Sequence, residues 1–364
     1  MTALFQNVKN IAQQVKTKIS PYLYGLLLHD NRKTCASMAR QLSVPVKRMY
    51  SSFKNANEKI ATIKLDLQMI ANNVKIAGEK RVLAIDGTMI SKVFAEKIQN
   101  IAYDYDGVLR RATQGLSIIV ASLLIGGSVF PLEFSFWQNQ PKKKANKKSR
   151  KRAKKDPNHK TKIMLAMQLI STLMDKILFD YLAMDGAFAS DQMIGFIEEK
   201  DLKYTMRIAR SRKVEIDGTL MKLREHKALR LIRNERCKTV QGSYKGHACF
   251  LTVNKRKKKN GKWETVYIIS NMSLSAKEQV EAYNRRWPID KSFRSQKQYL
   301  GLTDCQMCSE VKQTFHIFNV FLAYSLATLE KIANGTNSVE NILNAWRFSK
   351  KIQIFDDNND WANT

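Results

Sequence analysis

The strongest constraint on the fold of this chain is an uncharged stretch over residues 112–132, which contains Gly126-Gly127. Two adjacent glycines favour a tight turn, and the β-branched run Ile-Ile-Val before them favours a strand. This interruption makes one membrane-spanning helix a poor interpretation, so we predict two buried strands at 115–125 and 128–136. The chain is therefore expected to be built around a β-sheet and to have no membrane partner.

Strands and helices alternate along the rest of the chain. Residues before 81 read as helical, and residues 212–270 are β-like in the segments VEIDG, ALRLIR, KTVQGSY, HACFLTVN and WETVYIIS. The other predicted elements are strands at 81–86, 179–185 and 204–210, and helices at 160–178, 191–200, 276–301 and 310–333. Because a strand hairpin precedes the crossover helix, this order predicts an α/β fold with a mixed sheet flanked by helices.

The charge balance indicates a polyanionic partner. Lys and Arg number 62 against 32 acids, a net charge of +30. Nucleic acid is the commonest partner for such a chain, although a basic ribosomal-type protein would share the composition. Residues 142–155 hold ten Lys or Arg and no acid, which is typical of a DNA-contacting loop or of a solvated insertion. The candidate DNA-binding residues there are Lys142, Lys143, Lys144, Lys147, Lys148, Arg150, Lys151 and Arg152.

A helix-turn-helix pattern lies in the N-terminal region. Met38, Ala39 and Leu42 share one helical face, and Ser43-Val44-Pro45 breaks the helix. The next helix has an apolar stripe formed by Val46, Met49, Tyr50 and Phe53. Lys47 and Arg48 are expected to face outward, where a second helix of this motif enters the major groove. Any small helical bundle could show the same pattern.

Two aspartates share one context. Asp86 ends an apolar strand in LAIDGT, and Asp185 ends another in LAMDGAF. If the two strands are neighbours, their carboxylates converge at the rim of the sheet, and carboxylate oxygens are ligands that Mg²⁺ prefers. An Asp-Gly pair after a strand is also common in ordinary turns.

A third acid lies in the segment EAYNRRWPIDKSFRSQK. At helical spacing, the side chains of Tyr283, Arg286, Asp290 and Lys297 fall on one face, which suits a phosphate and metal site, although a solvated face would look the same. Pro288 removes a helical hydrogen bond, so a helix is expected to start or kink there.

These residues resemble the YREK signature of the insertion-sequence transposases grouped around insertion sequence four, with Phe293-Arg294 following the acid. LAIDGT and Asp185-Gly-Ala-Phe188 are similar to the first two catalytic-Asp segments of that family, and SVFPLEFSFW to the strand between them. One departure is clear: Asp290 stands where the family has Glu. Its side chain is one methylene shorter, so its helix must come closer to hold the same metal.

The resemblance implies a ribonuclease H-like DNA transposase that performs cut-and-paste transposition. Asp86, Asp185 and Asp290 would hold two Mg²⁺ ions, which Mn²⁺ can replace, and water followed by a 3′-hydroxyl would attack the DNA. The implied phosphate-binding residues are Tyr283, Arg286, Arg294 and Lys297, and Trp263 is a candidate for holding a flipped base. The implied partners are double-stranded DNA, as terminal inverted repeats and target, and a second copy in a homodimer.

The expected parts are a helical DNA-binding region (1–80), the first part of the catalytic core (81–211), a β-rich insertion (212–270), the C-terminal helices of the core (271–335) and a tail (336–364). Five irregularly spaced cysteines indicate a reduced, cytoplasmic chain. For an insertion-sequence transposase, the expected place is the nucleoid of a prokaryote. A ribonuclease H-like nuclease without strand transfer and an inactive, transposase-derived DNA-binding protein are the alternatives.

Overall fold

The computed structural model describes residues 10–15, 20–107, 109–139, 158–258 and 260–350. Its helices are α2 (Pro21–Leu28), α3 (Cys35–Gln41), α4 (Val46–Ser51), α5 (Ala56–Asn73), α6 (Lys162–Leu173), α7 (Asp191–Glu199), α8 (Ala276–Asn284), α9 (Pro288–Tyr299), α10 (Glu310–Ala333) and α11 (Val339–Ser349). Its strands are β1 (Arg81–Ser91), β2 (Ala102–Asp106), β3 (Arg111–Ile125), β4 (Ser128–Trp137), β5 (Tyr181–Met184), β6 (Tyr204–Ile208), β7 (Lys213–Ile216), β8 (Thr219–Lys222), β9 (Cys237–Tyr244), β10 (His247–Lys257) and β11 (Trp263–Ser270).

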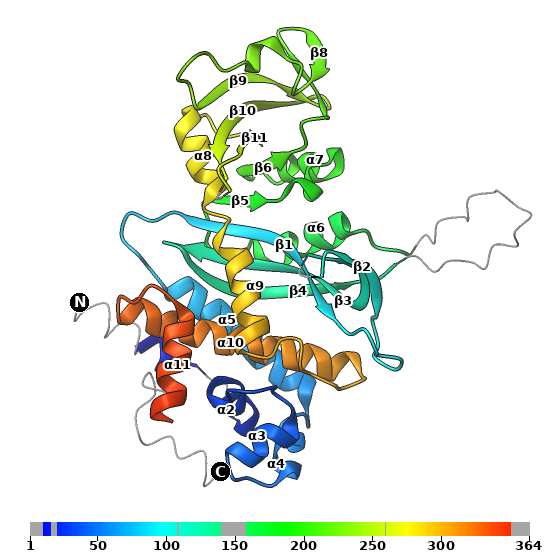
Figure 1. The fold of residues 1–364 in the computed structure, drawn as a ribbon, viewed down its shortest axis with the longest axis vertical. Coiled ribbons are helices and arrows are strands. Elements are labelled where there is room, and N and C mark those ends of the chain that lie inside the picture. The colour runs from blue at the N-terminus through cyan, green and yellow to red at the C-terminus, as the bar shows by residue number, and fades with distance from the viewer. Residues whose placement is uncertain (1–9, 16–19, 108, 140–157, 259, 351–364) are drawn as a thin grey trace, which may run out of the picture.

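The core is a mixed sheet in the order β4-β3-β1-β5-β6 (Figure 1). The first three strands pair antiparallel, whereas β1, β5 and β6 run parallel to one another. Helix α6 crosses from β4 to β5, and α7 crosses from β5 to β6. An antiparallel meander followed by two parallel strands in this order is the ribonuclease H-like arrangement, so the predicted fold class is confirmed.

The hairpin predicted from the uncharged stretch is confirmed. Strands β3 and β4 are almost wholly buried and pair from Ser117–Trp137 to Ile125–Ser128. Gly126 and Gly127 join them with φ values of +53° and +76°. Positive φ at both central residues is what a two-residue turn between twisted strands requires, and glycine adopts it without steric cost.

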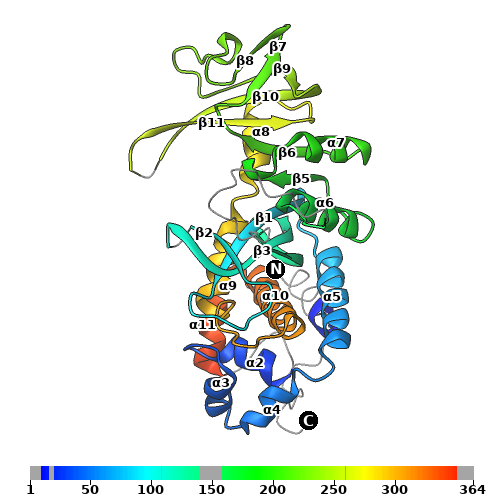
Figure 2. The ribbon, with the colours of Figure 1, turned by 90° about the vertical axis from the view of Figure 1, so that its right-hand side faces the viewer.

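The β-rich segment continues the same sheet. Strand β11 pairs antiparallel with β6, and β10, β9, β7 and β8 follow outward. Figure 2 shows these strands extending the sheet beyond its parallel part. The prediction of a strand at ALRLIR was wrong: the segment holds only a short 3₁₀ turn, Lys227–Leu229. Leu229 is buried there, and Ala228 and Leu231 pack partly buried against the core, so the segment is anchored as a loop.

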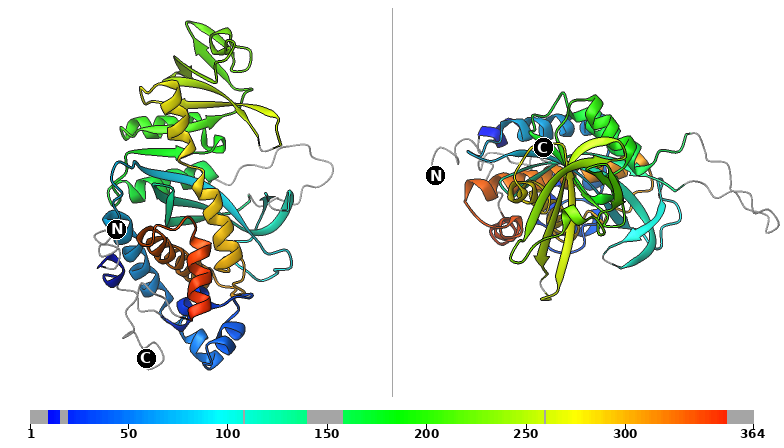
Figure 3. Two further views of the ribbon diagram at one scale, coloured as in Figure 1. Left: turned by 60° about the vertical axis from the view of Figure 1, so that its left-hand side comes forward. Right: turned by 90° about the horizontal axis from the view of Figure 1, so that it is seen from above.

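Helices enclose the opposite end of the molecule. The long helix α10 is buried along most of its length and packs beside α5 and β4, with α2 and α11 below it (Figure 3). Within the segment expected to be the C-terminal tail, the described residues form α11. Its Trp346 is fully buried, and Ser338 caps its first turn.

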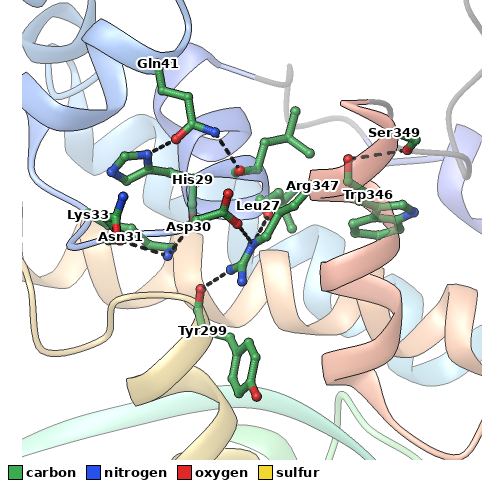
Figure 4. Close-up of polar contacts among 11 residues, drawn as sticks. Leu27, His29, Asp30, Asn31, Lys33, Gln41, Tyr299, Trp346, Arg347 and Ser349 are labelled. Carbon is green, nitrogen blue, oxygen red and sulfur yellow. Dashed lines mark hydrogen bonds and ion pairs between the residues drawn. The ribbon is translucent and has the colours of Figure 1, made fainter.

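Arg347 of α11 ties three segments together (Figure 4). Its guanidinium donates to the backbone oxygens of Leu27 at 3.3 Å and Tyr299 at 2.5 Å, and lies 3.5 Å from the Asp30 carboxylate. The N-terminal helices are thereby fastened to the end of α9.

The helix-turn-helix prediction is right in outline and wrong in one detail. Helices α3 and α4 are separated by a short break, and Met49 is buried. The predicted stripe is only half buried, because 39% of Val46 and 51% of Tyr50 are exposed. Helix α4 is one and a half turns long, so its periodicity cannot align four residues on one face.

Within the described residues, no helix combines the length and the apolar character that crossing a membrane would need.

Candidate active site

Parallel pairing of β1 with β5 brings the first two aspartates together. Ile85 is the register partner of Met184, so Asp86 and Asp185 each follow one residue later on neighbouring strands. The strand-end prediction holds for Asp185, which directly follows β5. It was wrong for Asp86, because β1 continues to Ser91 through antiparallel pairing with β3. Asp86 nonetheless lies beside the end of β5, because Ile85 forms the last pair with that strand.

Gly186 lets the chain turn closely after Asp185. A Cβ atom at this position would lie 3.1 Å from the backbone oxygen of Arg207 on β6, tighter than ordinary packing. The 3₁₀ turn Gly186–Phe188 therefore rests directly on the neighbouring strand. This contact fixes the position of the turn that directly follows Asp185.

The third aspartate comes from a broken helix. The predicted helix 276–301 consists of α8 and α9, separated by Arg285–Trp287, and Pro288 begins α9 as its residue type favours. Asp290 lies in the first turn of α9, where the helix dipole favours an acid. The prediction that a helix starts or kinks at Pro288 is confirmed, because α9 begins at this residue.

Arg286 joins the first and third aspartates. Its guanidinium lies 2.5 Å from the Asp86 carboxylate and 3.4 Å from that of Asp290. The Arg286 side chain is 8% exposed and that of Asp86 15%, so their ion pair is buried, whereas 53% of the Asp290 side chain is exposed. The break between α8 and α9 thus places Arg286 over β1.

The three carboxylates influence one another. Burial raises the pKa of Asp86 to about 6; Arg286 opposes this rise, and the negative charges of Asp290 and Asp185 add to it. The pKa of Asp290 is also raised, by burial and by Asp185. All three acids act on the Arg286 guanidinium and favour its charged form. The site therefore concentrates negative charge around one cation.

Tyr283 supports this arrangement from α8. Its ring packs with Val266 and Ile268 of β11, and the Arg286 guanidinium lies 5.9 Å from its centroid. Burial raises the pKa of the Tyr283 hydroxyl, so the group stays a proton donor at neutral pH. Tyr283 and Arg286 thus stand together with the acids, in the order that the signature implies.

The structure does not bring the remaining signature residues to the acids. Lys297 lies two turns further along α9, and the charge acting on it is that of Asp106 at the end of β2. Arg294 is exposed and donates to Gln298 at 3.2 Å. Any contact that Arg294 or Lys297 made with DNA would therefore lie outside the cluster formed by the three acids and Arg286.

Trp263 also lies apart from the acids. It begins β11 and pairs with Lys257, on the sheet face opposite to that of Val266 and Ile268, because successive side chains alternate. Helix α8 covers the Val266 face, so Trp263 points away from Tyr283. Lys47 and Arg48 are exposed on α4, and the residues of the basic run from 142 to 152 lie outside the described residues.

The sequence analysis did not identify a cluster of charged side chains around Glu264. Glu264 of β11 binds Arg256 at 3.0 Å, Arg207 at 3.4 Å and Lys258 at 3.7 Å. Arg256 in turn stacks on the half-exposed ring of Trp287, 4.9 Å from its centroid. The signal was weak: Trp287 adjoins Arg286 in sequence, but nothing in the spacing indicates that β10 and β6 reach this point.

The donor set suits a divalent cation. Three carboxylates and one guanidinium carry a formal charge of −2, and burial of Asp86 among acids makes added positive charge favourable. Hard oxygen donors are what Mg²⁺ selects. In the described part of the chain, however, no three acids, His or Cys stand close enough to form a ready metal cage. Arg286 contacts both Asp86 and Asp290, so any metal that these carboxylates held would have to compete with its guanidinium.

The strand order, with acids on β1 and beyond β5, defines a ribonuclease H-like protein. The chain belongs to the DDE superfamily endonucleases, because the model of that family matches residues 3–266. It is therefore an endonuclease by family. The matched stretch includes Asp86 and Asp185 and stops before Asp290.

Among solved structures, the chain is similar to Endonuclease V of Ciona intestinalis in complex with a 23mer DNA containing an inosine followed by a ribo-adenosine. The two are 9% identical, the match covers 62% of this chain and 87% of that chain, and the TM-score is 0.28. Likeness at that level adds nothing to the strand order. No curated protein sequence matches this chain significantly.

Proposed function

We propose that this endonuclease is a DNA transposase of the insertion-sequence-four type, which cuts an element from DNA and joins it to a target. The observation that carries the proposal is the Arg286 guanidinium, which holds Asp86 of β1 and Asp290 of α9 at once. That contact unites the first and third acids of the implied triad across 200 residues. The family match spans the segments that contain Asp86 and Asp185.

Asp86, Asp185 and Asp290 are the proposed ligands of two Mg²⁺ ions, with Mn²⁺ as a substitute. Metal ions held there would activate the attacking oxygen and stabilise the leaving oxygen of the phosphodiester. The shorter Asp290 can serve in place of Glu because α9 begins directly beyond the break, close enough for Arg286 to contact both it and β1.

Arg286 is the proposed phosphate ligand nearest the acids. Its Nε–H is buried and has no acceptor among the described residues. An unsatisfied buried donor costs roughly 1–3 kcal/mol, and a phosphate oxygen would satisfy it. Tyr283, held beside the guanidinium, would donate its hydroxyl to the same phosphate, and Arg294 and Lys297 would contact the DNA backbone further along α9.

The proposed partner is double-stranded DNA, as the inverted terminal repeats of the element and as target. Lys47 and Arg48 on α4, together with the basic residues 142–155, would bind it, and two copies of the chain would act as a homodimer on the DNA. The proposed place of action is the nucleoid of a prokaryotic cell.

The test is cleavage of a supercoiled plasmid that carries the coding sequence with its natural flanking DNA. We expect nicking in Mg²⁺ or Mn²⁺, none with chelator, and loss of nicking in Asp185→Asn. Asp191→Asn is the matched control, since Asp191 lies six residues on with 63% of its side chain exposed. Equal activity in the two variants would refute the site.

Joining of the cut end to a second plasmid separates the alternatives. Joined products support a transposase, whereas cleavage without joining indicates a nuclease of the same fold. Sequence-selective binding with no cleavage in either metal would indicate a DNA-binding protein derived from an inactive transposase.

A further inference from the structure

The β10–β11 hairpin has two chemically different faces. Side chains alternate along each strand, and cross-strand partners share a face. Glu264 and its partner Arg256 therefore lie on the face of Val266 and Ile268, which α8 covers. Trp263 lies on the opposite face, which we call the outer face, and Figure 2 shows the hairpin reaching out from the sheet.

The outer face gathers cations around one exposed aromatic ring. Lys257 is the cross-strand partner of Trp263, and Lys255 pairs with Thr265 beside it. The Arg236 guanidinium lies 4.4 Å from the centroid of the Trp263 ring, and the Lys255 ammonium 5.6 Å. Contacts of this kind hold both cations in place, which lowers the entropy that they would lose on binding an anion.

Among the residues that the structure describes, no carboxylate pairs with these outer-face cations. Glu264 is the acid of the hairpin that forms ion pairs, and it binds Arg207, Arg256 and Lys258 on the other face. None of Arg236, Lys238, Lys255 and Lys257 forms an ion pair within the part of the chain that the structure describes. Their charge is not compensated within the described residues, so this face suits an anionic partner.

We propose that the outer face, formed by Arg236, Lys238, Lys255, Lys257 and Trp263, binds the phosphate backbone of a second DNA duplex. A duplex lying over the acids would meet the α8 side of the hairpin, where Trp287 and Arg256 stand. One stiff duplex cannot lie on both faces of a sheet at once, because DNA resists bending over such a short length. The proposal rests on the proposed function, which requires two DNA segments to meet.

The test measures bridging of two short duplexes of unrelated sequence by the full chain. One duplex carries a fluorescence donor and the other an acceptor, so energy transfer reports bridging, while anisotropy reports binding of one duplex. The variant Arg236→Gln/Lys255→Gln/Lys257→Gln neutralises the outer face. The matched control, Lys75→Gln/Lys176→Gln/Lys203→Gln, removes the same charge from exposed positions elsewhere.

We expect the outer-face variant to lose energy transfer and the control to keep it. The salt dependence of bridging should flatten by about 0.9 in slope for each phosphate contact removed, up to about 2.7 for three. Bridging that is absent in the wild type, or equally strong in both variants, overturns the inference. Metal-dependent nicking of a single plasmid is measured alongside. A wild type that does not nick the plasmid refutes the proposed function. A wild type that nicks it, with an outer-face variant that bridges as well as the wild type, refutes only the role of the outer face.

Discussion

Removing the Arg286 side chain should separate its structural role from any role in DNA binding. In metal-free protein, Arg286→Ala leaves Asp86 buried beside Asp185 and Asp290 without its counter-charge. Breaking a buried ion pair from one side costs about 3–5 kcal/mol. The contact with the exposed Asp290 adds less than about 1 kcal/mol, because solvent screens it.

Arg285→Ala is the matched control. Arg285 lies in the same break and binds Glu79 at 2.5 Å, but the two side chains are 37% and 35% exposed. A pair of this kind contributes about 0–1 kcal/mol. Urea unfolding followed by circular dichroism, with chelator present, should therefore show a difference of roughly 2–5 kcal/mol between the two variants.

Mg²⁺ should restore part of the stability lost in Arg286→Ala. A metal ion that binds the folded chain stabilises it in proportion to its affinity, and without the guanidinium it meets no competing cation at Asp86. The stabilisation by Mg²⁺ should therefore be larger in Arg286→Ala than in wild type or in Arg285→Ala. Equal unfolding free energies for the two variants, or an identical Mg²⁺ effect in all three proteins, would show this reasoning to be wrong.

The remaining predictions concern other parts of the molecule. Asp290→Ala should abolish nicking, and Asp290→Glu should lower it if the site has adapted to the short side chain; an inactive wild type rescued by Glu would contradict this. Deleting residues 142–155 should flatten the salt dependence of DNA binding, by about 0.9 per phosphate contact, and an unchanged slope would show that they do not touch DNA. Gly186→Ala should lower the rate of nicking and leave the free energy of unfolding nearly unchanged, since the added Cβ meets the Arg207 backbone at 3.1 Å; full activity would show that the turn can shift. Burial lowers the pKa of Lys33 to about 8 from 10.5, so the unfolded chain binds more protons between these values. The free energy of unfolding should rise by about 3 kcal/mol from pH 8 to 10.5, and this gain should be lost as the pH falls from 10.5 back to 8; Lys33→Met, compared by urea unfolding, should lack the rise.

Most of the fold could be predicted because its signals are local. The Gly126-Gly127 turn, the apolar run before it and the position of Asp185 after a strand are read from neighbouring residues. Errors occurred where a local pattern was ambiguous. ALRLIR has the composition of a strand but has no pairing partner in the structure, and burial of Leu229 holds part of it as a 3₁₀ turn. Asp86 was placed at a strand end because Gly87 follows it, whereas antiparallel pairing with β3 carries β1 five residues further.

The candidate site likewise has one part that the sequence could predict and one part that depends on the packing. Residue type and spacing along the chain were enough to select Asp86, Asp185, Asp290 and Arg286, because metal and phosphate chemistry limits which side chains can serve. Spacing placed Lys297 on the face of these residues, but the break at Pro288 and the packing of α9 set it beside Asp106.

By itself, the sequence determined most strands and helices of the core, the basic character of the chain and its candidate acids, since each depends on side-chain chemistry or on periodicity over a few residues. Only the tertiary structure decided that β1 pairs with β5, that Arg286 reaches Asp86, and that Trp263 faces away from the acids. These contacts depend on which distant segments pack together, and packing is settled by the burial of the whole sheet and its helices. No pattern within a single segment carries that information.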